Sequence, residues 1–394
     1  MLSWRSASRI FPGSHACLRR SCSMKIFDIQ WHTYRLPFRN SFTTAHGVMT
    51  AREGIIVQIT TECGISGIGE IAPLPAFGGA SLADTCSLLP ALAARLQDKM
   101  LDEALDLVLA QGKKGTEAAF AFSAPAFCGL EIALLDAIGK VEGCGVCTLL
   151  SPPGNAPRAS VPVNAVIGAR ATEAAIVAAR EARKNGYHCV KLKALPIQEE
   201  VERVAAVRAA IGPAIHLRLD ANEAWNLEEA IAFLSQCVPY NIQYVEQPLK
   251  THDLAGMRAL RQAVPIPIAV DEALHNLESA QLILDSEAAD VLVIKPQLVG
   301  GLRVGQQIIQ AAAERGVRSV ITSTIEAGIG LTAALHLAAA SPAVTLECGL
   351  ATLHLLVDDL LVNNLPVHDG LLAVPTGPGL GIELDWEALR RYKL

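Results

Sequence analysis

The sequence predicts an α/β protein in which a parallel (β/α) barrel follows a smaller α+β domain. Between residues 161 and 349, short apolar runs alternate with amphipathic helical segments at a period of about 25 residues. Alternation repeated this often is typical of a parallel sheet, and eight strand-like runs predict a closed barrel. The residues before 161 lack this alternation, and a chain of 394 residues is long enough for two domains.

Within the barrel, each predicted strand is a short run rich in Val, Ile and Leu. The eight runs are residues 161–167, 188–194, 215–220, 242–246, 266–271, 291–295, 319–323 and 344–348. Amphipathic segments between them, such as 171–185, 198–211 and 302–315, are predicted as helices. We assign residues 151–349 to the barrel, and we expect the Pro- and Gly-rich residues 350–394 to return to the first domain.

The α+β domain is assigned to residues 24–150. Residues 25–36, 54–61 and 66–71 have strand patterns, whereas 81–111 and 116–141 have helical ones. Two loops are predicted in this domain, a polar one at 37–50 and an apolar one at 72–79 that carries Leu74 and Phe77.

Residues 1–23 are predicted to be a leader outside the fold. They carry Arg5, Arg9, Arg19 and Arg20 and no acidic residue, which is the composition of an organellar transit peptide. The alternative, which we favour, is that Met24 is the true start, because it opens directly into a strand. We expect residues 1–22 to be poorly packed, and the protein to be cytoplasmic unless the leader is a genuine transit peptide.

Composition excludes several classes of function. The chain is 51% hydrophobic and 18% charged with a net charge of −6, so it has no basic stripe for nucleic acid, and no apolar run is long enough for a membrane span. Ten scattered cysteines without a secretory signal fit a reducing compartment, and we interpret the isolated pair Cys144 and Cys147 as structural. A homo-oligomer is compatible with the sequence.

Two lysines on one predicted strand are the first sign of a functional site. Lys191 and Lys193 point to the same face, because strand side chains alternate. Burial and mutual repulsion are expected to lower their pKa values, so that one of them can accept a proton. The alternative is a half-exposed strand whose lysines are simply solvated.

Charged residues also end four consecutive predicted strands. Asp220, Glu246, Asp271 and Lys295 each stand at the carboxyl end of a run, where barrel active sites lie. Three carboxylates without His or Cys form a hard oxygen site that suits Mg²⁺, with Mn²⁺ as a second candidate. The alternative is three unrelated acids paired with arginines. A substrate carboxylate at such a site would place its α-carbon between lysines from two sides of the barrel, which favours removal of the α-proton to give an enediolate.

Taken together, these residues resemble the enolase superfamily in its muconate-lactonizing subgroup. The shared marks are Lys191-x-Lys193, Asp220-x-Asn222, Glu246-x-Pro248, Asp271-Glu272, Lys295 and Gly300-Gly301. The resemblance implies a modified TIM barrel of (β/α)7β type, with a capping domain formed by the N-terminal part and the C-terminal tail. It also implies that loops 37–50 and 72–79 close over the barrel and select a small carboxylate substrate.

Within that subgroup the chain is similar to the o-succinylbenzoate synthase family. The stretches that carry this likeness are residues 69–75, 217–225, 323–331 and 377–381. The implied reaction is a syn dehydration by a carbon–oxygen hydro-lyase of menaquinone or phylloquinone biosynthesis. Its substrate would be 2-succinyl-6-hydroxy-2,4-cyclohexadiene-1-carboxylate, and its product o-succinylbenzoate.

Three alternatives to this activity stay open. Some relatives racemise N-acylamino acids with both lysines. Dipeptide epimerases have Asp-x-Asp where this chain has Glu347-Cys348-Gly349, which counts against an epimerase. Ala327 stands where a serine is common in the synthases, and this is a departure from the synthase pattern. A non-catalytic barrel protein is the remaining alternative.

The resemblance also implies a role for each candidate residue. Lys193 would be the base, Lys295 would hold the developing negative charge, and Lys191 would add to the positive field. Asp220, Glu246 and Asp271 would bind the metal, with Asn222 and Glu272 orienting them or the lysines. Leu74 and Phe77 would shape the pocket, and the helix start around Glu326, Gly328 and Ile329 would receive a substrate carboxylate through its N–H groups.

Overall fold

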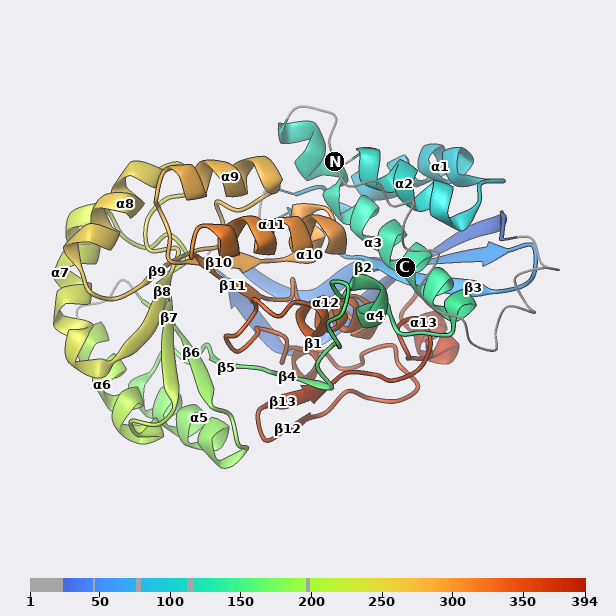
Figure 1. Cartoon of the computed structure of the whole chain (residues 1–394). Coiled ribbons are helices and arrows are strands. Elements are labelled where there is room, and N and C mark those ends of the chain that lie inside the picture. The colour runs from blue at the N-terminus through green and yellow to red at the C-terminus, as the bar shows by residue number, and fades with distance from the viewer. Residues whose placement is uncertain (1–23, 45–46, 76–78, 112–116, 196–198) are drawn as a thin grey trace.

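The computed structural model describes residues 24–44, 47–75, 79–111, 117–195 and 199–394 (Figure 1). The predicted leader, residues 1–23, lies outside the described residues. Figure 1 shows a curled parallel sheet with its helices beside a second layer of antiparallel strands and helices. None of the helices in the described ranges combines the length and the hydropathy that a membrane span requires.

The antiparallel sheet has the order β1 (Ile26–Thr44), β2 (Gly47–Thr61) and β3 (Ser66–Ile71). The predicted loop at 37–50 is therefore wrong in large part, because β1 runs on to Thr44 and β2 begins at Gly47. The pairing is irregular between Pro37 and Phe42. Strand β1 lies at the edge of this three-stranded sheet, where a proline is tolerated.

Three helices cover this sheet: α1 (Leu82–Leu96), α2 (Leu101–Gln111) and α3 (Glu117–Glu142). The single helical segment predicted at 81–111 is divided in two, because Asp98 adopts a left-handed backbone with φ 62°. Helix α3 lies directly on β3, and it does so because β3 has glycines there. A Cβ atom at Gly67 or Gly69 would come within 2.0 Å of a carbonyl oxygen of α3.

The barrel sheet contains seven parallel strands in the order β11 to β5. They are β5 (Ala165–Ile167), β6 (Cys189–Lys193), β7 (His216–Asp220), β8 (Ile242–Glu246), β9 (Ile268–Val270), β10 (Val291–Ile294) and β11 (Arg318–Ile321). The predicted eighth strand at 344–348 does not form. Two isolated parallel bridges take its place, Val163 with Cys348 and Thr322 with Gly349, and they connect the two edges of the curled sheet.

The predicted first barrel strand is also divided. Only β5 joins the barrel, whereas β4 (Ser160–Pro162) pairs antiparallel with β13 (Leu371–Ala373). Strand β13 in turn pairs with β12 (Val367–His368). The chain changes partners at Val163, whose N–H donates to Gly370 while it bridges to Cys348.

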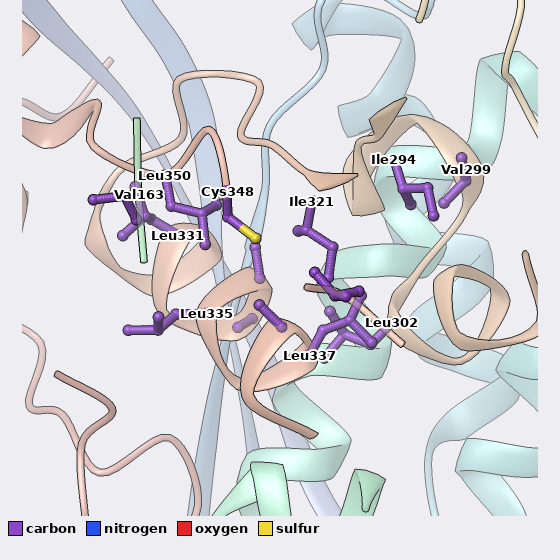
Figure 2. Packing of buried hydrophobic residues seen from close by; sticks show 14 of the residues in the cluster. Val163, Ile294, Val299, Leu302, Ile321, Leu331, Leu335, Leu337, Cys348 and Leu350 are labelled. Atoms are coloured by element: carbon purple, nitrogen blue, oxygen red, sulfur yellow. The ribbon is translucent and has the colours of Figure 1, made fainter. Parts of the chain in front are cut away.

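Helices follow most barrel strands, as predicted. They are α5 (Thr172–Lys184), α6 (Glu200–Ile211), α7 (Leu227–Cys237), η4 (Val238–Tyr240), α8 (Leu254–Ala263), α9 (Leu277–Asp285), α10 (Pro296–Val299), α11 (Leu302–Glu314) and α12 (Gly328–Ala340). Helix α12 is buried along its whole length and contacts α4 (Val146–Leu150) and β3. Figure 2 shows its Leu331, Leu335 and Leu337 near Ile321 and Cys348 of the barrel.

The C-terminal segment returns to the first domain, as expected. It contains η5 (Leu353–Leu355) and α13 (Trp386–Arg391). Leu356 bridges to Phe38, and Lys393 bridges to Tyr34 on β1. The α+β part and this segment together form the capping domain of a modified (β/α) barrel.

Two buried carboxylates of the capping domain hold it on the barrel. Glu131 on α3 accepts the N–H groups of Leu302 and Arg303 at 2.7 and 2.9 Å, at the start of α11. Glu70 on β3 accepts the N–H groups of Ala327 and Gly330 at 2.7 and 2.8 Å, at the start of α12. Each carboxylate therefore satisfies backbone donors that a helix start leaves without partners.

Stability should depend on pH through Glu131. Burial raises its pKa to about 7, against the opposing effects of the N–H bonds and the Arg303 charge. A carboxyl whose pKa is raised in the folded state stabilises the fold below its unfolded pKa, and that contribution is lost as pH rises toward 7. Wild type should lose up to roughly 3 kcal/mol more than Glu131→Gln over this range. Urea unfolding at several pH values measures the difference, with exposed Glu228→Gln as control. Parallel pH curves for wild type and Glu131→Gln would contradict the prediction.

Candidate active site

The parallel register of the barrel sets the candidate site residues at one level. Lys193 on β6 lies opposite Asp220 on β7, and Asp220 lies opposite Glu246 on β8. All three stand at the carboxyl ends of their strands and face the interior. The Lys193 Nζ atom donates to Asp220 Oδ2 at 2.7 Å. The sheet thus aligns the three residues without any help from loops.

Two further residues continue this row beyond the next strands. Asp271 follows β9, and Lys295 follows β10. The Lys295 Nζ atom lies 2.6 and 2.5 Å from the two oxygens of Asp271, so the pair is bidentate. Both side chains are buried. The carboxylates therefore lie between Lys193 at one end of the row and Lys295 at the other.

Lys191 joins two of the acids. Its Nζ atom lies 2.8 Å from Asp220 Oδ2 and 2.7 Å from Glu246 Oε1. Burial by itself lowers the pKa of Lys191, but the charges of Asp220 and Glu246 outweigh it and raise that pKa well above its usual value. The predicted lowering of the pKa is wrong for Lys191, because its nearest neighbours are anions and not Lys193. Burial likewise opposes the lysines at Asp220, and Lys191 and Lys193 still hold its pKa well below the usual range.

Asn222 and Glu272 support this row from one side. The Asn222 Oδ1 atom accepts from Lys193 Nζ at 2.5 Å, and its Nδ2 atom donates to Glu272 Oε1 at 2.7 Å. Asn222 adopts a left-handed backbone with φ 44°, which its short polar side chain tolerates. Asn222 therefore links Lys193 to Glu272, and the role of this pair in orienting a metal ligand or a lysine stays a prediction.

The carboxylates retain capacity for a cation. Among the described residues, the buried carboxylate oxygens without a hydrogen-bond partner are Asp220 Oδ1, Glu246 Oε2 and Glu272 Oε2. Buried anionic oxygens are costly without one, and two of them on adjacent strands fit a hard divalent ion. In the described part of the chain, no three His, Cys, Asp or Glu side chains are grouped closely enough to hold a metal, because ammonium groups lie between the acids. A cation bound by all three acids would displace Lys295 from at least one Asp271 oxygen.

A cavity of about 100 Å³ lies over this row and has two kinds of lining. Its apolar side chains are Met49, Leu74, Val166, Val293, Val320 and Ile325. Its hydroxyl side chains are Thr322, Ser323, Thr324 and Thr352. Pockets for small ligands usually hold about 300–1,000 Å³, so a ring-sized acid would require part of this lining to move.

The structure separates the residues predicted to contact substrate. Leu74 is buried and lines the cavity, whereas Phe77 lies outside the described residues. Glu326, Gly328 and Ile329 are buried but do not line the cavity.

The helix start that was expected to receive a substrate carboxylate is occupied from within the protein. Glu70 accepts the N–H groups of Ala327 and Gly330, and the N–H of Gly328 donates to the Asp359 carbonyl at 2.8 Å. The expectation is wrong for the N–H groups of Ala327, Gly328 and Gly330, because the capping domain and the C-terminal segment already satisfy them.

Several lining residues were missed in the sequence, although strand alternation could have found some of them. Tyr244 and Val293 stand two residues before Glu246 and Lys295, and therefore face the same side. Thr352 follows the last predicted barrel strand and carries no sequence signal. Met49 belongs to the predicted loop at 37–50 but reaches the cavity from β2.

The last predicted strand and the residues after it offer the cavity no acidic side chain. Glu347 turns away to Arg218, with 2.8 Å between Oε2 and Nη2. Gly349 lines the cavity, and a Cβ atom there would lie 2.2 Å from Thr322 Oγ1. The backbone at Gly349 therefore approaches Thr322 too closely for any side chain.

Comparison with known families identifies the class of protein. The model for the mandelate racemase / muconate lactonizing enzyme N-terminal domain matches residues 22–151, and the enolase C-terminal domain-like model matches residues 174–388. The chain therefore belongs to the enolase superfamily, which confirms the resemblance found in the sequence.

Individual relatives have different activities. O-succinylbenzoate synthase of Thermobifida fusca is 39% identical over 222 residues, which cover 55% of this chain and 67% of the relative. The structure of muconate lactonizing enzyme from Pseudomonas fluorescens with muconolactone has a TM-score of 0.86 and 27% identity, and the match covers 94% of this chain and 100% of that one. A dipeptide epimerase from Enterococcus faecalis, solved with Mg and the dipeptide L-Leu-L-Tyr, has a TM-score of 0.85 and 28% identity over 91% of this chain and 100% of that one.

Substituting Gly349 should destabilise the protein at the edge of the site. Gly349→Ala forces Thr322 to shift, so we expect a loss of roughly 1–3 kcal/mol in the free energy of unfolding. Gly168→Ala is the matched control, since a Cβ atom there meets no atom within 4 Å. Denaturant unfolding of both variants measures the effect. Equal stability of Gly349→Ala and Gly168→Ala would show that the backbone can relax around Thr322.

Proposed function

We propose that this protein is an o-succinylbenzoate synthase, which dehydrates 2-succinyl-6-hydroxy-2,4-cyclohexadiene-1-carboxylate with the help of Mg²⁺. The observation that carries the proposal is the row of carboxylates with a lysine at each end. The 39% identity to a synthase supports the choice of substrate over those of the other relatives. A small carboxylate substrate also agrees with the lysines and the apolar side chains that line the cavity.

Asp220, Glu246 and Asp271 would hold the ion, with Asn222 and Glu272 orienting the neighbouring groups. Bound Mg²⁺ would stabilise the negative charge that develops on the substrate carboxylate when the α-proton leaves. The fit rests on the unpartnered oxygens of Asp220 and Glu246 and on the all-oxygen donor set.

Lys193 would act as the base. Its Nζ atom is held by Asp220 and Asn222 and lies at the end of β6, where it can face the substrate α-carbon. In the reaction, the C–H bond breaks as the proton passes to the neutral amine. The C–O bond to the ring hydroxyl then breaks, and Lys193 returns the proton so that water leaves from the same face. The ring becomes aromatic without any oxidant.

Lys295 would remain charged throughout the dehydration. Burial by itself lowers its pKa, but the charges of Asp271 and Glu272 outweigh this effect and raise the pKa. Its ammonium group can attract the developing negative charge and then the face of the aromatic product. Lys191, bonded to Asp220 and Glu246, would keep those carboxylates in position and add positive charge.

Racemisation of N-acylamino acids is the second candidate, because it needs a base on each face of the α-carbon and the row has a lysine at each end. Dipeptide epimerisation is less well supported. Glu347 is engaged by Arg218, and Gly349 has no room for a side chain, so the acidic pair seen in such epimerases has no counterpart in the cavity.

Two lysine substitutions test the assigned roles. Lys193→Ala should lower the rate of dehydration by at least about 10³-fold, because no other group would take the α-proton. Lys295→Arg keeps a cation and should slow dehydration less than it slows racemisation. The assays use the cyclohexadiene acid and N-succinylamino acids with added Mg²⁺, and exposed Lys184→Ala serves as the control.

Three results would contradict this assignment. Near-normal dehydration by Lys193→Ala together with its loss in Lys295→Arg would reverse the two roles. Racemisation by wild type without any dehydration would favour the second candidate. Turnover that is unaffected by chelation of divalent ions would remove the metal from the proposal.

A further inference from the structure

Ile325 has a backbone conformation that is unusual for its type. Its φ is 61°, in the left-handed region, although it is β-branched, and such outliers persist only where their surroundings enforce them. Ile325 lines the cavity together with Thr324 before it. A strained segment of the cavity wall therefore requires something that holds it.

Contacts within the segment hold only part of it. The N–H of Thr324 donates to Glu326 Oε2 at 2.8 Å, and the N–H of Ile325 donates to Ser323 Oγ at 3.2 Å. Both bonds connect residues two positions apart, so both can move with the segment. Neither fixes residues 324–327 relative to the rest of the site, whereas Ser323 is bonded to the Gly349 carbonyl and to the Thr352 hydroxyl.

Arg52 of the capping domain supplies one fixed point. Its Nε atom donates to the Thr324 carbonyl at 3.2 Å. The same guanidinium donates to the carbonyls of Glu53, Pro73 and Ala72, each at 2.7 Å. Arg52 is only 2% exposed and does not line the cavity. It ties β2 and the start of the loop after β3, which carry Met49 and Leu74, to the wall that carries Ile325.

Glu70 supplies the second fixed point on the other side of Ile325. It accepts the N–H of Ala327, and the hydroxyl of Tyr34 donates to it at 2.5 Å. Gln297, two residues after Lys295, donates to the Glu70 carbonyl at 2.8 Å and accepts the N–H of Ala72 at 3.0 Å. The capping domain thus holds the backbone immediately before and shortly after Ile325.

We propose that Arg52 and Glu70 are positioning residues that hold the strained wall 323–327 in the conformation that binds substrate. They act through backbone groups and touch neither the lysines nor the carboxylate row. Losing them should weaken substrate binding and leave proton transfer largely intact. The kinetic part of this inference rests on the proposed function, whereas its structural part does not.

The test compares Arg52→Met with Arg208→Met. Arg208 is a matched control, since its guanidinium also donates to backbone carbonyls, those of Tyr240, Gly212, Ile215 and Asn241, but it does not line the cavity. Hydrogen–deuterium exchange is followed in peptides that cover residues 322–331. We expect exchange about tenfold faster in Arg52→Met and unchanged in Arg208→Met. Equal exchange in the two variants overturns the proposal, whatever the substrate of the enzyme is.

Kinetics and a second substitution distinguish positioning from general stabilisation. Arg52→Met should raise KM about tenfold and change kcat by less than about threefold. Glycine adopts a positive φ without strain, so in an Ile325→Gly background the same substitution should change KM far less. If Arg52→Met raised KM equally in the wild-type and Ile325→Gly backgrounds, Arg52 would only stabilise the fold.

Glu70→Gln provides an independent variant if Arg52→Met does not fold. It keeps the size of the side chain and loses one acceptor, so faster exchange at residues 322–331 supports the proposal and unchanged exchange contradicts it. If wild type does not dehydrate the cyclohexadiene acid, the proposed function fails, while the exchange results still decide the role of Arg52 and Glu70.

Discussion

Three ammonium groups and three carboxylates lie together at the carboxyl ends of the barrel strands, where the carboxylates and Lys295 are buried and Lys191 and Lys193 are half-buried. Neither set could be placed there without the other. Isolated charges in a protein interior cost several kcal/mol each, whereas pairs at 2.5–2.8 Å compensate one another. The parallel register of β6, β7 and β8 makes this arrangement possible, because it places Lys193, Asp220 and Glu246 at one level. The unpartnered oxygens of Asp220 and Glu246 then mark where the compensation is incomplete and where a divalent ion would complete it.

The capping domain depends on the same principle of satisfied buried groups. Glu70 and Glu131 are buried and accept hydrogen bonds from helix starts on the barrel. Arg52 is buried and donates hydrogen bonds to four carbonyls. The bonds from Arg52, Glu70 and Glu131 to the barrel join segments far apart in sequence, so both domains contribute to the wall of the cavity. The domain that covers the site therefore also sets the shape of its wall.

The sequence predicted the charged row well, because two periodicities specify it. Alternation along each strand fixes the direction of Lys191 and Lys193, and the repeat of the barrel unit fixes the acids at consecutive strand ends. Long-range pairing was not predictable in this way. The segment 37–50 contains polar residues that are typical of a loop, although β1 extends to Thr44 and β2 begins at Gly47. The predicted eighth strand is reduced to two isolated bridges, at Cys348 and Gly349. From the sequence alone, the N–H groups at the helix start near Ala327 were free to bind a substrate. The fold brings Glu70, which is distant in sequence, to these groups.

The most direct test of the account is the position of a bound divalent ion. Crystals of the protein soaked with Mn²⁺ should show one strong anomalous peak per chain between Asp220, Glu246 and Asp271, with ligand distances near about 2.1–2.2 Å. Lys295 should have moved from at least one Asp271 oxygen, and Asp220→Asn should abolish the peak. A peak elsewhere, or none while the three lysines keep their carboxylate partners, would contradict the central claim that the row is a metal-dependent active site.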